Sequence, residues 1–242
     1  MNPAETRAVD SSRYPPSIAK AGLMEPCPRR IRAMRGGATV LDSLRAVYVW
    51  SSPHYPSYYL PIDDVDPEIV ALDSTKTFDN GPFAGLVHVG WKAVDAWFEE
   101  DEEVFGGHPR NPYVRCDAIR SSRPIRVELE GVILAESASP VLLFETGLPT
   151  RHYIQRTDVF FSHLKHTNTV TYCPYKGTTS DYWSARINDR THRNIAWSYA
   201  YPHPSVASVA GLVAFYDEQV DTFLDGVPVT RPGRKSVRRG KS

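Results

Sequence analysis

The chain has 242 residues, 41 % of them hydrophobic, and Lys plus Arg equals Asp plus Glu. This length and composition allow a buried core in one large or two small domains. A body without net charge has no global field that would draw it onto nucleic acid or an acidic membrane. Twenty prolines, fifteen glycines and 11 % aromatic residues favour a turn-rich, mainly β protein over a helical bundle.

Cysteine usage and the lack of long apolar runs indicate the compartment. Cys27, Cys116 and Cys173 are widely separated and form no C-x-x-C pair, which is unlike a disulfide framework or a zinc site. No apolar run approaches the roughly 20 residues of a membrane span, and no signal-type segment is recognisable. We therefore expect a cytoplasmic protein that has no membrane partner.

In chain order, we expect an irregular arm over residues 1–28, a first β repeat over 29–108, a second, site-bearing β repeat over 109–228, and a basic tail over 229–242. The arm is rich in Pro, Ser and small polar residues, which is typical of irregular structure. The tail carries six Lys or Arg residues from Arg231 onward. A solvated tail is favoured, and a weak contact with nucleic acid is the alternative.

An internal repeat organises the prediction. Without gaps and at an offset of 94 residues, 31–65 matches 125–159, with identities such as Ile31/Ile125 and Val65/Val159. A gapless match of this length indicates one β unit that occurs twice. We therefore expect a mainly β fold made of two pseudo-repeated units of coiled antiparallel sheet, with one clear α-helix between them.

Each unit is expected to contain the same strands. In 125–129 apolar residues alternate with charged ones, the period-2 pattern of a half-buried strand. Glu130-Gly131, like Gly36-Gly37 in the first copy, supplies a hairpin turn. The apolar run 141–144 fits a strand buried on both faces. Later strands are expected over 169–172, 182–185, 195–199, 212–216 and 220–224, with a further hairpin at Asp225-Gly226.

The predicted helix covers 94–104, because Val94, Trp97, Phe98 and Val104 would lie near one side of it. The run EEDEE within it is interpreted as a solvated face, since carboxylate ligands of a metal need a second, converging element.

Several separated motifs resemble a known family. The run FETGLPTRHYIQRTDV, followed by TYCPYKGTTSDYWS, IAWSY and GLVAFYDEQVDTFLDGV, is similar to domain-of-unknown-function family 427 over roughly Arg30 to Val227. The corresponding segment of that family resembles LPTRYY, and here His152 replaces the first of its two tyrosines. Asp181 looks like a small insertion in the Tyr-Trp-Ser strand. The resemblance implies a mainly β fold of coiled sheets, often in two tandem copies, and it brings no established reaction. The first copy lacks the Y-C-x-Y-K-G turn, so a site is expected in the second.

Four residues of the second copy are candidates for catalysis. Cys173 is a nucleophile or a small buried residue. Lys176 is an amine walled by aromatics or a surface lysine on a turn. Glu145 ends an apolar strand, where an acid is either paired or has its protonation shifted. Its structural interpretation is an ion pair with Arg151 that locks the turn. The candidate substrate-binding residues are His152, Tyr153, Tyr172, Tyr175, Tyr182, Trp183 and Trp197.

No metal or cofactor is expected. His163 and His166 have no third ligand at a recognisable spacing, and no phosphate-cradling loop or serine-hydrolase elbow occurs. The leading hypothesis is a cofactor-independent enzyme of the cyclase, isomerase or lyase type, which acts on a small, largely apolar organic molecule in an aromatic-lined pocket. The alternatives are a non-catalytic small-ligand-binding module and an interaction domain that uses the basic tail.

Overall fold

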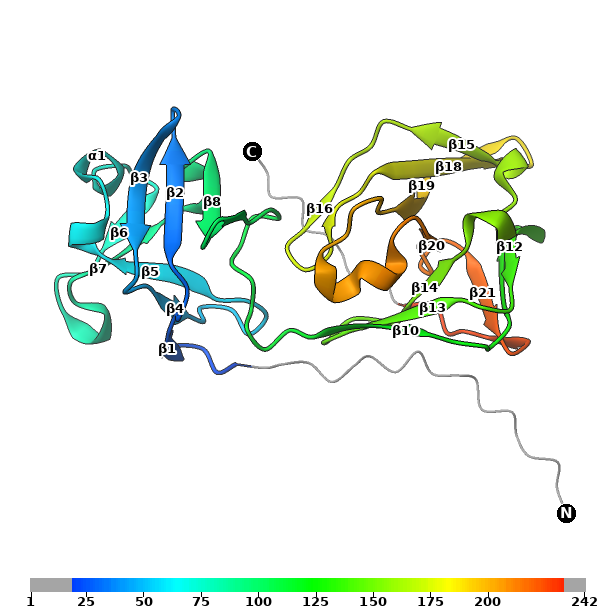
Figure 1. The fold of residues 1–242 in the computed structure, drawn as a ribbon, viewed down its shortest axis with the longest axis horizontal. Coiled ribbons are helices and arrows are strands. Elements are labelled where there is room, and N and C mark those ends of the chain that lie inside the picture. The colour runs from blue at the N-terminus through cyan, green and yellow to red at the C-terminus, as the bar shows by residue number, and fades with distance from the viewer. Residues whose placement is uncertain (1–18, 233–242) are drawn as a thin grey trace, which may run out of the picture. The chain divides into compact units, whose positions relative to one another are not determined.

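The computed structural model describes residues 19–232, which divide into two compact units between Val114 and Arg115. Both units are built from antiparallel strands (Figure 1), so the predicted mainly β fold is confirmed. Most of the predicted arm and tail, residues 1–18 and 233–242, lies outside the described residues. No helix in the described part is long and apolar enough to cross a membrane.

The first unit ends at Val114. Its strands are β1 (Met24–Pro26), β2 (Ile31–Arg35), β3 (Ala38–Ser43), β4 (Val47–Val49), β5 (Ser57–Pro61), β6 (Thr75–Thr77), β7 (Leu86–Val89), β8 (Ala96–Glu99) and β9 (Glu102–Glu103). Its helical turns are η1 (Ile62–Asp64), α1 (Pro67–Val70), η2 (Gly81–Phe83) and η3 (Trp91–Ala93). The strands form one sheet in the order β1-β4-β5-β7-β6 and a second in the order β3-β2-β8-β9.

The second unit begins at Arg115. Its strands are β10 (Cys116–Arg120), β11 (Ile125–Leu129), β12 (Val132–Ser137), β13 (Val141–Glu145), β14 (Arg151–Ile154), β15 (Leu164–Thr167), β16 (Tyr172–Cys173), β17 (Gly177–Thr178), β18 (Asp181–Ile187), β19 (Arg190–Ser198), β20 (Val213–Phe215), β21 (Asp221–Leu224) and β22 (Val227–Pro228). Its 3-10 turns are η4 (Arg156–Asp158), η5 (Phe161–His163) and η6 (Pro204–Val209). The sheets have the orders β10-β13-β14-β20-β19-β18-β15, β12-β11-β21-β22 and β16-β17.

The strand registers repeat at the offset seen in the sequence. Leu41 bridges Val65 in the first unit, and Ala135 bridges Val159 in the second, each 94 residues further along. The pairing of β1 with β4 has the register of β10 with β13 at the same offset. The two units are therefore copies of one β unit, and β10 is the counterpart of β1.

Beyond this shared part the second copy is longer. The hairpin β8–β9 corresponds to the hairpin β21–β22, which lies 125 residues further along the chain. In each copy an arginine of the neighbouring strand lies over a phenylalanine ring of this hairpin. Arg32 lies 5.5 Å from the Phe98 ring centroid and Arg126 lies 4.6 Å from that of Phe223. β19 pairs with β20 as β6 pairs with β7, while β15–β18 have no counterpart among the described residues of the first copy. The second copy therefore gains its additional residues between β14 and β19.

The helix predicted over 94–104 is wrong. Residues 96–99 form β8, which pairs with β2, and a turn at Glu100, with φ at 53°, leads into β9. Trp97 and Glu99 are buried while their neighbours are half-buried, which is a period of two. The spacing of Val94, Trp97, Phe98 and Val104 fits a helix, but Phe98 lies on the opposite face of the strand from Trp97, next to Arg32. The only α-helix in residues 19–232 is the four-residue α1.

Each predicted hairpin forms where the turn residues can adopt a positive φ. Glu130 and Gly131 have φ of 49° and 80°, and Asp225 and Gly226 have 55° and 75°. Two consecutive positive φ values define the turn whose twist suits a two-residue hairpin. Glycine adopts this backbone without strain, which is why the sequence already showed these turns.

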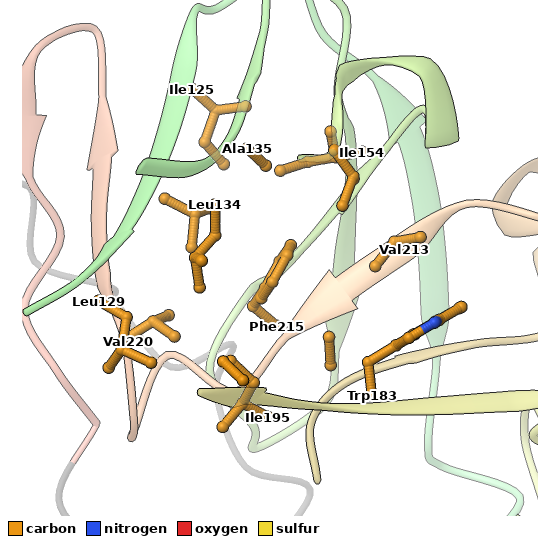
Figure 2. Close-up of a cluster of buried hydrophobic side chains, with 14 of the residues drawn as sticks. Ile125, Leu129, Leu134, Ala135, Ile154, Trp183, Ile195, Val213, Phe215 and Val220 are labelled. Carbon is orange, nitrogen blue, oxygen red and sulfur yellow. The ribbon is translucent and has the colours of Figure 1, made fainter. Parts of the chain in front are cut away.

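The seven-stranded sheet of the second unit has a buried cluster on each face. Along β14 and β20 the side chains alternate, so Ile154 and Val213 join one cluster while Tyr153 and Ala214 join the other. The buried residues of the first cluster are aliphatic apart from Trp183 and Phe215 (Figure 2). The partly buried Phe161 packs against them. The second is rich in tyrosine and adjoins the polar residues described next.

Candidate functional site

A buried ion pair lies in the part that the second copy adds. Lys176, in the turn between β16 and β17, donates from Nζ to Glu145 at the end of β13. The two side chains are only 12 % and 10 % exposed. The backbone fixes the turn, because the Lys176 N–H donates to the Cys173 carbonyl at 3.3 Å and its carbonyl accepts from the His203 N–H at 3.0 Å.

Aromatic hydroxyls and thiols surround the Lys176 ammonium. Tyr153 is fully buried, and Tyr199 is almost so. The Tyr153 hydroxyl has no well-formed hydrogen bond to any described residue, and its ring meets Trp197 edge to face at 6.3 Å. Cys116 pairs with Glu145 across β10 and β13. The predicted residues Glu145, Tyr153, Cys173 and Lys176 thus converge, together with the unpredicted Cys116 and Tyr199.

The charges of this cluster are fixed by burial and by the ion pair. Burial lowers the pKa of Lys176, but Glu145 together with Cys173, Tyr153 and Cys116 outweighs this effect, and the pKa ends well above its usual value. Burial raises the pKa values of Cys116 and Tyr153 to about 12. At neutral pH Lys176 is therefore an ammonium and not a free amine, which does not suit the role of a Schiff-base former and suits that of a cationic donor.

Arg151 belongs to a second polar network. Its guanidinium donates to Glu218 at 2.6 and 2.8 Å and to Asp217 at 3.2 Å. The expected pair between Glu145 and Arg151 is therefore wrong, because two carboxylates that follow β20 engage the arginine and Lys176 engages Glu145. The same arginine lies over the rings of Trp197 and Tyr216, and Trp197 also meets Tyr153 of the first network.

Asp217 is the centre of this network. It is buried and accepts from the Thr222 hydroxyl at 2.7 Å, and His152 Nδ1 lies 3.5 Å away. Burial alone raises the pKa of Asp217, but His152 and Arg151 outweigh it and leave the pKa below its usual value. Asp217 is thus a buried carboxylate that accepts hydrogen bonds from Arg151 and Thr222, with His152 beside it.

The predicted aromatic residues do not all lie together. Tyr182 and Trp197 join Tyr153 in one core cluster, whereas Trp183 belongs to the cluster on the opposite face (Figure 2). Tyr172 is 55 % exposed, and Tyr175 is half-buried. Strand alternation explains the split, because neighbours along a strand point to opposite faces.

Two buried carboxylates escaped the sequence analysis. Asp217 directly follows the apolar run of β20, as Glu145 ends that of β13, so the same reasoning would have found it. Glu99 in the first unit was expected on a solvated face, but it is buried and accepts from Arg29 at 2.7 Å and from the Tyr58 hydroxyl at 2.6 Å. No sequence signal distinguishes Glu99 from the other acids of its run.

A hollow of about 400 Å³ lies elsewhere in the second unit. It opens over β11, β12 and the turn after β21, and none of the predicted site residues lines it. The lining residues are Pro124, Ile125, Arg126, Glu136, Ser137, Ala138, Phe223 and Gly226. In residues 19–232 no three His, Cys, Asp or Glu residues gather as metal ligands would.

Comparison with known families agrees with the repeat. A family model described as "Domain of unknown function (DUF427)" matches residues 23–92 and 117–226, one segment in each structural copy. A comparison with curated proteins gives no match.

Proposed function

We propose, for a chain that belongs to the family described as Domain of unknown function (DUF427), that the second copy is a cofactor-independent enzyme acting on a small, largely apolar organic molecule. The reaction would be an isomerisation, cyclisation or elimination. Lys176 and Glu145 would carry it, with Tyr153 beside them.

One observation carries this proposal: among the described residues, a pair equivalent to Lys176 and Glu145 is found in the second copy and not in the first. At the offset of 94 residues Ser51 stands where Glu145 stands, and the turn that holds Lys176 belongs to the part that the first copy lacks. The first copy builds its sheets without this pair. Because a buried ion pair contributes little net stability compared with apolar packing, a role in chemistry explains its presence better than a role in folding.

The arrangement suits proton movement next to a developing negative charge. An ammonium held in an apolar surrounding stabilises an oxyanion far better than it would in water. Glu145 would accept a proton from a carbon atom next to a carbonyl group and return it at another position, so that no co-reactant is consumed. Lys176 would stabilise the oxygen anion between the two steps.

The test is turnover by the full chain and by matched variants. A panel of apolar carbonyl and hydroxyl compounds would be incubated with the protein, and products followed by mass spectrometry and NMR, since an isomer keeps the mass of its parent. We expect Lys176→Met and Glu145→Gln to lower turnover by about 10²-fold or more. Arg29→Met, which breaks the Glu99 pair of the first copy, should leave turnover unchanged.

The same experiment separates catalysis from binding alone. Compounds that bind and are never converted would favour the alternative, a non-catalytic ligand-binding module. Turnover that survives in both Lys176→Met and Glu145→Gln, with folding verified by thermal melting, would refute the roles given to these residues.

The proposed compartment is the cytoplasm, which the three free cysteines support.

A further inference from the structure

The residues that line the hollow of the second copy have counterparts in the first. Four lining residues are the same in both copies at offsets of 94 and 125 residues, and the acid at the rim is also kept, as Asp42 and Glu136. The pairs that keep their identity are Ile31/Ile125, Arg32/Arg126, Ser43/Ser137 and Phe98/Phe223. The surface of the hollow is therefore shared by both copies.

The other three lining positions carry smaller residues in the second copy than in the first. Arg30, Leu44 and Asp101 of the first copy correspond to Pro124, Ala138 and Gly226. Each residue of the second copy is much smaller than its counterpart. The hollow of about 400 Å³ thus lies where the first copy has larger side chains. Of these, Arg30 pairs with Asp42, whereas Leu44 and Asp101 are mostly exposed to solvent.

The first copy also shows which group its acid binds. The Arg30 guanidinium donates two hydrogen bonds to the Asp42 carboxylate, from Nε to Oδ1 at 2.7 Å and from Nη2 to Oδ2. In the second copy proline replaces that arginine. Glu136 is exposed, and its side chain makes no ion pair or hydrogen bond with any residue in 19–232. Arg126, the other charged residue of the hollow, pairs with Glu128 at 2.7 Å and lies over the Phe223 ring.

We propose that this hollow binds the arginine side chain of a peptide partner, with the guanidinium on Glu136 in the place that Arg30 takes on Asp42. The planar fork of a guanidinium matches a carboxylate with two parallel bonds, which an ammonium cannot do. The methylene stem of the arginine would lie along the apolar floor made by Ile125 and Ala138. This site is separate from the Lys176 cluster and does not depend on its chemistry.

The test is a titration of the isotope-labelled full chain with the peptide acetyl-Gly-Arg-Gly-amide, followed by NMR. Backbone signals of residues 124–126, 136–138 and 223–226 should shift with weak, saturable binding. Glu136→Gln should weaken this binding about fivefold, in line with one exposed ion pair. Pro124→Arg, which restores the residue of the first copy, should abolish binding because its side chain pairs with Glu136.

Two controls complete the design. Asp42→Asn, the equivalent change in the first copy, should leave the affinity for the peptide unchanged, because Arg30 already covers that position. Acetyl-Gly-Lys-Gly-amide should bind more weakly than the arginine peptide. Equal binding of both peptides, equal binding by Glu136→Gln, or unsaturable shifts in the original protein would each overturn the proposal.

Discussion

At the scale of single residues, the buried pair of Lys176 and Glu145 places two opposite charges in a largely apolar interior. Both side chains are largely removed from water, and the Lys176 ammonium and the Glu145 carboxylate face each other directly. Removing one partner leaves an uncompensated charge among tyrosines and thiols. Removing both returns the site to an apolar core.

Lys176→Met should therefore destabilise the second unit by about 3 kcal/mol, the usual cost of leaving a buried charge without its partner. The double variant Lys176→Met/Glu145→Leu should regain most of that loss. Chemical denaturation measures both, and Lys76→Met, on an exposed lysine of β6, is the control for the loss of a lysine elsewhere. Equal stability of the single variant and the original protein would show that the pair is not buried as described.

Cys116 provides a prediction about pH. Burial and the Glu145 charge raise the pKa of its thiol from 9.0 to about 12. A raised pKa favours the folded state below the pKa of the unfolded chain, and this stability is lost as pH rises through the folded value. Between pH 9 and 12 the free energy of unfolding should fall more steeply for the original protein than for Cys116→Ala. Parallel curves would contradict the environment assigned to this thiol.

Sequence reasoning selected most of this site but not its pairing. Glu145, Tyr153, Cys173 and Lys176 were found because polar residues at the end of an apolar strand or in a tight turn stand out. The partner of Glu145 could not be deduced, since Lys176 reaches it through a separate hairpin 31 residues further along the chain. Arg151 was nearer in sequence, and it pairs instead with Asp217 and Glu218, which follow β20.

At the scale of elements, turn chemistry decided which strands could be predicted. The hairpins at Glu130-Gly131 and Asp225-Gly226 were recognisable because glycine marks a positive φ. The hairpin after Glu99 was not, since Glu100 adopts a φ of 53° without a glycine to signal it. The turn between β18 and β19 has the same property, for Asn188 and Asp189 have φ of 46° and 59°.

Asp189→Gly should thus stabilise the second unit by about 1 kcal/mol, because glycine relieves the strain of a left-handed backbone at this position. The ion pair of Asp189 with Arg186 is largely exposed and contributes little. Asp189→Ala is the matched control, since alanine removes the same carboxylate and keeps the strain. Thermal melting should rank glycine above the original residue and alanine at or below it. The reverse order would show that the turn is not strained.

At the scale of the whole molecule, the chain is one β unit used twice, with a segment added to the second copy. The offset of 94 residues, visible in the sequence, recurs in bridges and strand registers. Repetition was predictable because both copies need the same inward-facing residues. The added strands β15–β18 were predicted only in part, since nothing in the first copy indicates how they pair.

Equivalent core positions should have equivalent energetic weight. Leu60 and Ile154 lie 94 residues apart, and both are fully buried. Leu60→Ala and Ile154→Ala should each cost about 3 kcal/mol through lost apolar burial and the cavity left behind. Hydrogen exchange should show protection falling first in the unit that carries the substitution. A much smaller effect at one position would mean that the two cores are not equivalent.

The account depends most on Lys176 being a buried ammonium held by Glu145, and side-chain ¹⁵N NMR of the lysine Nζ measures this directly. The account predicts a slowly exchanging ammonium signal that does not titrate until the pH exceeds 10.5, the usual lysine value, and that is lost or shifted in Glu145→Gln. A Lys176 signal that titrates below 10.5, or that is unchanged by the loss of the carboxylate, would contradict it.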